Sequence, residues 1–122
     1  MEYQYRFEKL NVWLEAKELV ILVYGLLKMF PAEERYALCD QVRRAVISVP
    51  SNIAEGSGRI SVKEQVHFTE IAYGSLMELY CQLQISLELG YFTEEDFKPI
   101  KQKIGVVGKL LSGYRANLSS KP

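Results

Sequence analysis

The sequence contains few of the residues on which most catalytic and metal sites depend. Its 122 residues include one histidine, His67, and two cysteines, Cys39 and Cys81, which do not form a CxxC motif. A glutamate follows His67 by three positions, but a di-iron bundle needs two Glu-x-x-His motifs in which the glutamate comes first. A nucleophilic cysteine would need a basic partner, and the sequence identifies none. The sequence therefore predicts a protein that is not an enzyme and holds no metal or other cofactor.

Long apolar segments are missing as well. The longest apolar run, LVILVYGLLKMF at residues 19–30, is shorter than the ~20 residues that cross a bilayer, and Lys28 interrupts it. The N-terminal stretch MEYQYRFEKL is charged and aromatic, unlike a secretory signal. Because the two cysteines also stand alone, the chain is predicted to be cytoplasmic, with reduced thiols and no membrane partner.

The chain has no net charge, since 15 basic residues balance 15 acidic ones. The charges are nevertheless distributed unevenly. From Lys98 to the end of the sequence there are six basic residues and no acidic residue. A solvated helix face would give this pattern, and so would a surface that binds a polyanion.

Hydrophobic residues make up 48% of the chain and recur at spacings of three and four, which is typical of amphipathic helices. Glycines, prolines and capping residues divide the chain into helical segments at residues 10–29, 31–58, 61–89 and 93–116. Helices of this length with short links predict an all-α protein, an antiparallel up-down-up-down four-helix bundle. The predicted single domain covers residues 1–118, and residues 119–122 form a short C-terminal tail.

The first predicted helix is apolar nearly all round over VILVYGLL, residues 20–27. A helix with apolar residues on every side needs cover on more than one face. We expect another subunit to supply part of that cover.

Two prolines lie inside predicted helices. Val49 and Ile53 keep the helical phase on both sides of Pro50, so the second helix is predicted to be kinked there but continuous. Pro99 lies beyond the first turn of the fourth helix and is expected to kink that helix or delay its start.

Capping signals mark the helix ends. A left-handed glycine, Gly56 or Gly58, is expected to end the second helix, and Gly90 to end the third. Residues 61–64 have the S-x-x-E pattern of a capping box, and residues 93–96 have a weaker version of it.

Polar side chains run beside the apolar stripes of the second and third helices. They predict either a polar network between the two helices or a merely solvated face, with Arg44 and Glu78 as an expected ion pair. The set comprises Gln41, Arg44, Ser48, Asn52 and Glu55 on the second helix, and Ser75, Glu78 and Gln82 on the third.

Four segments together resemble a known family. They are FEKLNVWLEAKELV, FPAEERYALCDQVRRAVISVPSNIAEGSGR, FTEIAYGSLMELYCQL and LELGYF, in that order along the chain. They are similar to the small bacterial four-helix-bundle family first named for open reading frames inside intervening sequences of large-subunit rRNA genes. The similarity covers residues 7–115. SVPSNIAEGSGR is a specific part of it, and AYGSLMEL supports it independently.

The resemblance implies a fold and a class of function. Members of the family assemble as ring-like homopentamers. Related accessory variability determinants of diversity-generating retroelements are pentamers that bind nucleic acid and partner a reverse transcriptase, and they are not enzymes. Those relatives are strongly basic, whereas this chain is neutral with a pI near 6.6. Five copies of the basic C-terminal helix in a ring would concentrate its charge on one surface.

Two hypotheses follow. In the first, the chain is a non-enzymatic homo-oligomeric scaffold, expected to be a pentamer, that binds RNA or other nucleic acid through a basic C-terminal helix face. In the second, it is an adaptor for a polymerase or reverse transcriptase that uses exposed aromatics such as Tyr3, Tyr5 and Tyr91 without touching nucleic acid. The first hypothesis predicts a phosphate-binding set made of Lys98, Lys101, Lys103, Lys109 and Arg115, with Arg43 and Arg59 as additions.

Overall fold

The computed structural model describes residues 2–121, and that part of the chain contains four α-helices. Met1 and Pro122, which open the predicted domain and close the predicted tail, lie outside the described residues. Two short 3-10 helices, η1 (Arg6–Lys9) and η2 (Ala32–Glu34), precede the first and second α-helices. The α-helices are α1 (Asn11–Leu27), α2 (Leu38–Ser57), α3 (Val62–Glu88) and α4 (Glu94–Ser119).

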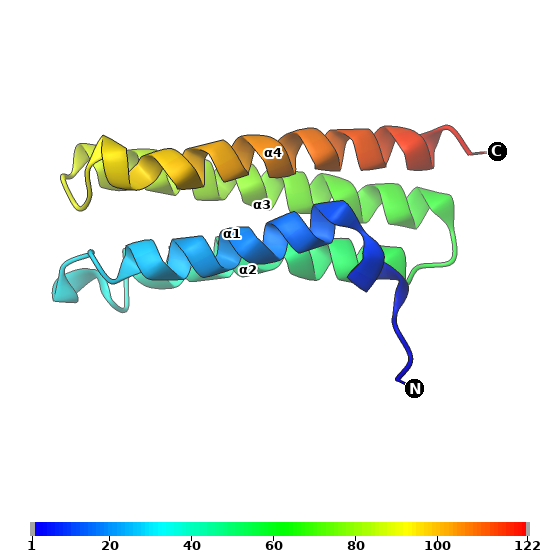
Figure 1. Ribbon diagram of the computed structural model, residues 1–122, viewed down its shortest axis with the longest axis horizontal. Coiled ribbons are helices and arrows are strands. Elements are labelled where there is room, and N and C mark those ends of the chain that lie inside the picture. The colour runs from blue at the N-terminus through cyan, green and yellow to red at the C-terminus, as the bar shows by residue number, and fades with distance from the viewer. Residues whose placement is uncertain (1, 122) are drawn as a thin grey trace.

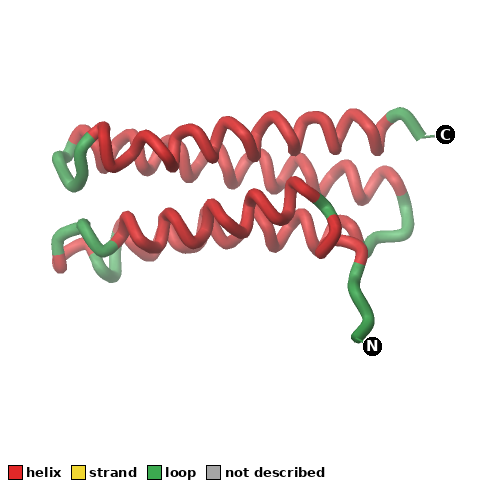
Figure 2. The backbone as a smooth tube through the Cα atoms, in the orientation of Figure 1, coloured by secondary structure: helices red, strands yellow, loops and turns green. Residues whose placement is uncertain are grey.

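The helices lie side by side along one long axis, and each runs opposite to the one before it (Figure 1). α1 and α3 each pack against both α2 and α4, so the predicted antiparallel four-helix bundle is confirmed. Loops join the helix ends, and residues 2–121 contain no strand (Figure 2). Both ends of the described chain therefore lie at the end of the bundle that carries the α2–α3 connection.

The apolar stripes of the four helices meet in one core along the bundle axis. Leu19, Val46, Leu76 and Val107, one from each helix, are completely buried. Burying a side chain of this kind stabilises the fold by about 1.5–3 kcal/mol. Among the helices that the structure describes, none combines the length and the apolar composition that crossing a membrane requires.

α1 has a second apolar side that its own chain leaves uncovered. Ile21 is 70% exposed, and Leu14, Leu22 and Tyr24 are also exposed on this helix. A hollow of about 330 Å³ beside Ile21 continues this apolar surface onto Ile47 of α2. The prediction that α1 needs cover from outside the chain is consistent with these exposures.

Neither proline interrupts its helix. α2 continues through Pro50, and Val49 and Ile53 are buried on both sides of it, as their phase predicted. α4 begins at Glu94 and contains Pro99, so the expected delay of its start was wrong. Pro99 is exposed, and its missing N–H removes one helical hydrogen bond near the N-terminal end, where the capping side chains hold the helix.

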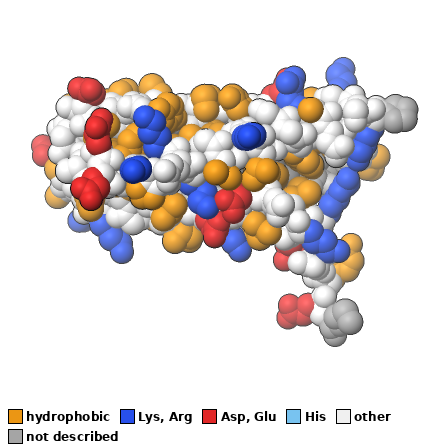
Figure 3. All heavy atoms as spheres, turned by 45° about the horizontal axis from the view of Figure 1, so that its top comes forward, with side chains coloured by type: hydrophobic (Ala, Val, Ile, Leu, Met, Phe, Trp, Pro, Cys, Tyr) orange, Lys and Arg blue, Asp and Glu red, His pale blue; other side chains and the backbone are white. Residues whose placement is uncertain are grey.

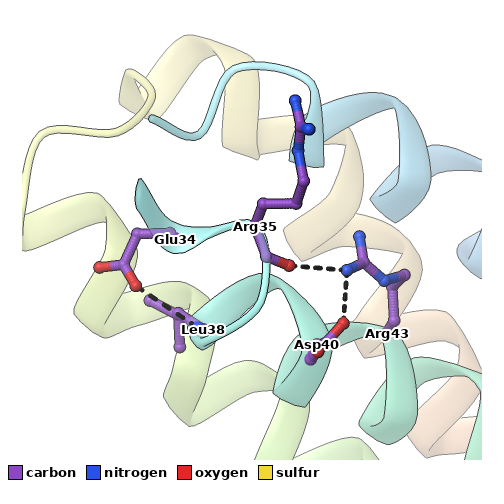
Figure 4. Close-up of polar contacts among 5 residues, drawn as sticks. All are labelled: Glu34, Arg35, Leu38, Asp40 and Arg43. Atoms are coloured by element: carbon purple, nitrogen blue, oxygen red, sulfur yellow. Dashed lines mark hydrogen bonds and ion pairs between the residues drawn. The ribbon is translucent and has the colours of Figure 1, made fainter. Parts of the chain in front are cut away.

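α2 begins at Leu38 and not at Pro31, because the chain first turns through η2. Pro31 is the N-cap of η2. Glu34 accepts a hydrogen bond from the backbone N–H of Leu38 (3.4 Å), and the Arg43 guanidinium donates to the carbonyl of Arg35 (2.9 Å), as Figure 4 shows. The prediction of a helix from Pro31 was wrong because these side chains stabilise a separate turn before α2.

The left-handed glycine predicted at the end of α2 was also wrong. Gly58 is in the right-handed helical region (φ −89°), and Gly90, with φ +80°, is the one residue of the described chain with positive φ. Gly56 serves close packing instead. A Cβ atom at this position would lie 2.6 Å from the Cβ of Phe68, so the glycine allows α2 and α3 to approach each other.

Side chains cap the starts of both α3 and α4, as predicted, but the complete capping box is the one at α4, which was predicted to be the weaker. Ser61 accepts a hydrogen bond from the backbone N–H of Glu64 (3.1 Å), which is half of a capping box. At the start of α4 both halves are formed, because Thr93 and Asp96 each bond the backbone of the other. The hydrogen bond from the Thr93 backbone lowers the pKa of Asp96.

Candidate nucleic-acid interface

The seven cations of the predicted phosphate-binding set do not form one surface. Lys98, Lys101 and Lys109 are exposed on α4, and within the described residues they form no ion pair at 4.0 Å or less. Each of the other four cations is paired with a carboxylate. Figure 3 shows Lys and Arg side chains spaced along the molecule among hydrophobic ones, with acidic side chains at the left end, near the middle and toward the lower right.

Lys103 connects α4 to α1. Its ammonium lies 2.8 Å from a carboxylate oxygen of Glu15 and 3.1 Å from one of Glu18. The hydrogen bond with Glu15, and next the one with Glu18, raises the pKa of Lys103, and the same contact lowers the pKa of Glu15. Its side chain is only 23% exposed, so Lys103 is engaged within the bundle on the side of α4 that faces α1.

Arg115 and Arg59 are paired near the end of the bundle that carries the chain ends. Arg115 donates to Glu70 of α3 (2.6 Å), which joins α3 and α4. Arg59 donates to Glu55, one helical turn earlier (2.8 Å), and its guanidinium lies over the ring of Phe68 at 4.8 Å from the centroid. Both pairs are largely exposed, so a polyanion could compete for these guanidinium groups.

Arg43 lies near the other end of the bundle, at the start of α2. Its guanidinium donates to Asp40 at 2.6 Å as well as to the Arg35 carbonyl (Figure 4). The hydrogen bond to Asp40 raises the pKa of Arg43 further above its ordinary value. Because α2 packs against α1 and α3, the structure does not bring Arg43 together with the lysines of α4.

The three free lysines line a groove between α3 and α4. One hollow, of about 250 Å³, is lined by Lys98 and Lys101, and the next, of about 380 Å³, by Lys101 and Lys109. A third, of about 340 Å³, extends toward Arg115. Lys101 borders the first two hollows and Tyr73 borders the last two, so the three hollows follow one another along the same side of α3 and α4. Together they are called the α3–α4 groove.

Aromatic residues of α3 form the opposite wall of the α3–α4 groove. Tyr73, which is 40% exposed, and Tyr80 lie one above the other with Met77 between them. Tyr80 is half-buried and stacks on Phe97, with the ring centroids 6.3 Å apart. Our sequence reasoning missed these residues, although their spacing of four and three on α3 places them on one side of that helix.

Two glycines of α4 leave part of the α3–α4 groove lined by backbone without side chains. A Cβ atom on Gly105 would meet no atom within 4 Å, and one on Gly108 would contact Leu76 at 3.5 Å and Tyr73 at 3.9 Å. Both glycines line the same hollow as Lys101 and Lys109. A flat group can therefore approach the α4 backbone between two lysines.

The polar set on α2 and α3 is partly connected and partly solvated. The hydroxyls of Ser48 and Ser75 form a hydrogen bond at 2.7 Å between the helices, and the Asn52 amide donates to the Ser48 hydroxyl at 2.8 Å. Gln41 is exposed to solvent. Glu55 of the same set belongs to the exposed pair with Arg59.

The expected ion pair between Arg44 and Glu78 is not formed in the described chain. Arg44 is exposed, and Glu78 accepts a hydrogen bond from Gln82 on its own helix (3.3 Å). The other amide atom of Gln82, its carbonyl oxygen, is buried without a partner. Both side chains are exposed, and an ion pair between exposed charges gains little over their solvation.

Tyr91, expected to be an exposed contact for a partner, is half-buried and used within the fold. Its hydroxyl donates to Glu34 (2.6 Å) and so joins the α3–α4 connection to the turn before α2. This hydrogen bond raises the pKa of Tyr91 to about 12. Tyr3 and Tyr5, by contrast, are exposed and pack edge to face.

The described residues offer no arrangement for metal binding, because no group of three or more His, Cys, Asp or Glu comes together in them. His67 is exposed and packs edge-on against Phe68. Cys39 is buried, and loss of solvation raises the pKa of its thiol, which lowers its reactivity as a nucleophile.

Comparison with known proteins gives one family and one fold. The family model described as 23S rRNA-intervening sequence protein matches residues 8–113. A crystal structure from Bacteroides thetaiotaomicron, titled as a protein with unknown function from the S23 ribosomal protein family, is similar with a TM-score of 0.78 and 22% identity. The similarity covers 85% of this chain and 97% of that one. No curated protein matches the sequence.

Proposed function

Because the chain belongs to the 23S rRNA-intervening sequence protein family, we propose that it is a non-enzymatic homo-oligomeric scaffold that binds RNA. The observation that carries the proposal is the row of exposed, unpaired lysines along one groove, Lys98, Lys101 and Lys109. The chain as a whole has no net charge, so binding depends on this local concentration of positive charge. Phosphate groups are the anions that such a row recognises without reading sequence.

The structure refines the set of residues that the proposal uses. Lys98, Lys101 and Lys109 make the primary phosphate contacts, and Arg115 joins them by exchanging Glu70 for a phosphate. Lys103 is excluded, because two carboxylates of α1 already surround its ammonium. This exclusion makes Lys103 a control on the same helix.

The experiment is fluorescence anisotropy of a labelled structured RNA at two salt concentrations. With three phosphate contacts, raising monovalent salt fourfold should weaken binding roughly 20- to 40-fold. The double variant Lys101→Gln/Lys109→Gln should weaken binding at low salt and flatten the salt dependence. Lys103→Gln, matched in chemistry and position on α4, should change neither. Equal losses in the double variant and in Lys103→Gln would contradict the assignment, and no binding at low salt would contradict the function.

The homo-oligomer, a pentamer by resemblance to the family, is part of the same proposal. Its support is the uncovered apolar side of α1, where Ile21 is 70% exposed. Apolar surface of this kind on a small soluble domain marks an interaction site. Sedimentation equilibrium should give a mass several times that of one chain, and Ile21→Glu should reduce it. A wild-type protein that sediments as a monomer would overturn this part.

A second candidate function is a protein adaptor for a polymerase or reverse transcriptase. The observation that favours it is the exposed aromatic pair Tyr3 and Tyr5, 78% and 61% exposed, ahead of η1. Tyr91 is no longer part of that surface, because it bonds Glu34. A complex formed by this surface should persist at salt concentrations that abolish phosphate contacts and should be lost in Tyr3→Ala/Tyr5→Ala.

A further inference from the structure

We propose that the α3–α4 groove holds a single-stranded nucleic acid, with one base stacked on Tyr73 and the phosphates following the lysines of α4. The inference rests on the proposed function, RNA binding, and specifies the form of nucleic acid and the residue that contacts a base. Three features of the groove support it: its length, the exposed aromatic ring, and the arrangement of charge in a single row.

The α3–α4 groove is long enough for several nucleotides. Its α4 wall extends from Lys98 to Ser112, which at 1.5 Å per residue is ~21 Å. At ~3.4 Å for each stacked nucleotide, this length accommodates about six. The three hollows follow one another along this path, with Lys101 between the first two and Tyr73 between the last two.

Tyr73 has the exposure that a stacking platform needs. Its ring borders two of the hollows, and it is 40% exposed. The bare backbone of Gly108 lies under the edge of the ring, where a Cβ atom would be 3.9 Å away. Tyr80 differs because its ring already stacks on Phe97 and is half-buried, so it forms the wall. Base stacking on an exposed aromatic ring tolerates any sequence, because every base has a π-face.

The charges match one strand better than two. The three free lysines stand on one helix, on one side of the groove, and can follow one phosphate backbone. A duplex would hide its bases from Tyr73, and its second backbone would need cations farther round α4. The cation in that direction, Lys103, is neutralised by Glu15 and Glu18. Glu94 and Glu70 lie at the two ends of the groove, which confines the positive potential to its middle.

The probe is a fluorescein-labelled 12-nucleotide oligoadenylate RNA, compared with a 12-base-pair RNA duplex. We expect the single strand to bind more tightly at equal salt. Tyr73→Ala should weaken single-strand binding roughly tenfold or more, as expected for loss of one stacked base. Tyr36→Ala is the control, since Tyr36, between η2 and α2, is 82% exposed and lines none of the three hollows. It should bind as the wild type does.

A second readout reports stacking itself. Tyr73→Trp should retain the affinity, and its added tryptophan fluorescence should be quenched by the oligonucleotide. The wild-type protein provides the control, because its single tryptophan, Trp13, lies on α1 beside the opposite groove between α1 and α2. Its fluorescence should not change on binding.

The outcomes separate this inference from the proposed function. Normal oligoadenylate binding by Tyr73→Ala, with loss in Lys101→Gln/Lys109→Gln, would overturn the stacked base and leave RNA binding standing. Equal affinity for the duplex would overturn the single-stranded form in the same way. Absence of binding to either RNA would overturn the proposed function itself. If Tyr73→Ala changed the sedimenting mass instead of the affinity, the groove would be occupied by a second copy of the chain, and the inference would be wrong.

Discussion

The two sides of α3 differ in how closely a neighbouring helix approaches. On the α2 side, Gly56 lets the helices touch at Phe68, and the hydroxyls of Ser48 and Ser75 form a hydrogen bond. On the α4 side, Tyr73 and Tyr80 line hollows that follow the contact between α3 and α4. The α2–α3 contact, made by small and hydroxyl-bearing residues, is called the closed seam, and the α3–α4 contact with its hollows is called the open seam. The closed seam stabilises the bundle, and the open seam is available to a ligand.

The largest effect should come from filling the closed seam. Gly56→Ala places a Cβ atom 2.6 Å from the Cβ of Phe68, a position that backbone movement alone can relieve. We expect a loss of about 1–3 kcal/mol, of which the better helix propensity of alanine recovers at most ~1. Thermal unfolding followed by circular dichroism measures it. A melting temperature equal to or above that of the wild type would show that the seam is looser than the structure indicates.

Removing the polar contact across the closed seam should have a smaller effect. Ser75→Ala deletes the partner of the Ser48 hydroxyl, which keeps its hydrogen bond from Asn52. A loss of about 0.5–1.5 kcal/mol is expected on urea denaturation. Ser112→Ala, an exposed serine on α4, is the control and should change stability little. If both serine variants had equal effects, the hydrogen bond between α2 and α3 would contribute nothing measurable.

The open seam should respond to alanine in the opposite direction. At Gly105 a Cβ atom meets nothing within 4 Å, so Gly105→Ala gains helix propensity without a clash. We expect stabilisation of up to ~1 kcal/mol, measured on the same unfolding curve as Gly56→Ala. Destabilisation by Gly105→Ala would mean that α3 and α4 are closer together than they are here.

The smallest effect on stability should come from removing the ion pair between Lys103 of α4 and Glu15 of α1. The hydrogen bond from Lys103 lowers the folded-state pKa of Glu15 below its ordinary value. A lowered pKa adds stability above the unfolded-state pKa, and this contribution is lost as the pH falls through the folded-state pKa. Lys103→Gln should therefore make the melting temperature fall slightly less between neutral pH and about pH 3. Lys101→Gln, which breaks no ion pair, should retain the wild-type acid dependence.

Periodicity and capping residues predicted the fold because they act locally. The phase of Val49 and Ile53 was enough to carry α2 through Pro50, and the T-x-x-D pattern at 93–96 located the start of α4. Contacts between residues far apart in the sequence could not be predicted from these local patterns. Lys103 meets Glu15 and Glu18 more than 80 residues away in sequence, so its neutralisation appears only when α1 and α4 are packed together.

The start of α2 and the open groove show the same limit. Glu34, which accepts from the Leu38 N–H at the start of α2, also accepts from Tyr91, far along the chain. The charge count from Lys98 onward predicted a basic surface on α4 but could not separate free lysines from paired ones. The sequence could have grouped Tyr73 with Met77 and Tyr80, since their spacing places the three on one side of α3. Recognising it as a groove wall required knowing which helix lies opposite.

The position of the two chain ends has a practical consequence. Residues 2 and 121 both lie at the end of the bundle that carries the α2–α3 connection, whereas the connections joined by Tyr91 and Glu34 lie at the other end (Figure 1). A tag joined at either terminus would therefore attach the protein to a sensor surface by the same end. The molecules would stand in one orientation, with the long α3–α4 groove open along their sides to whatever flows past.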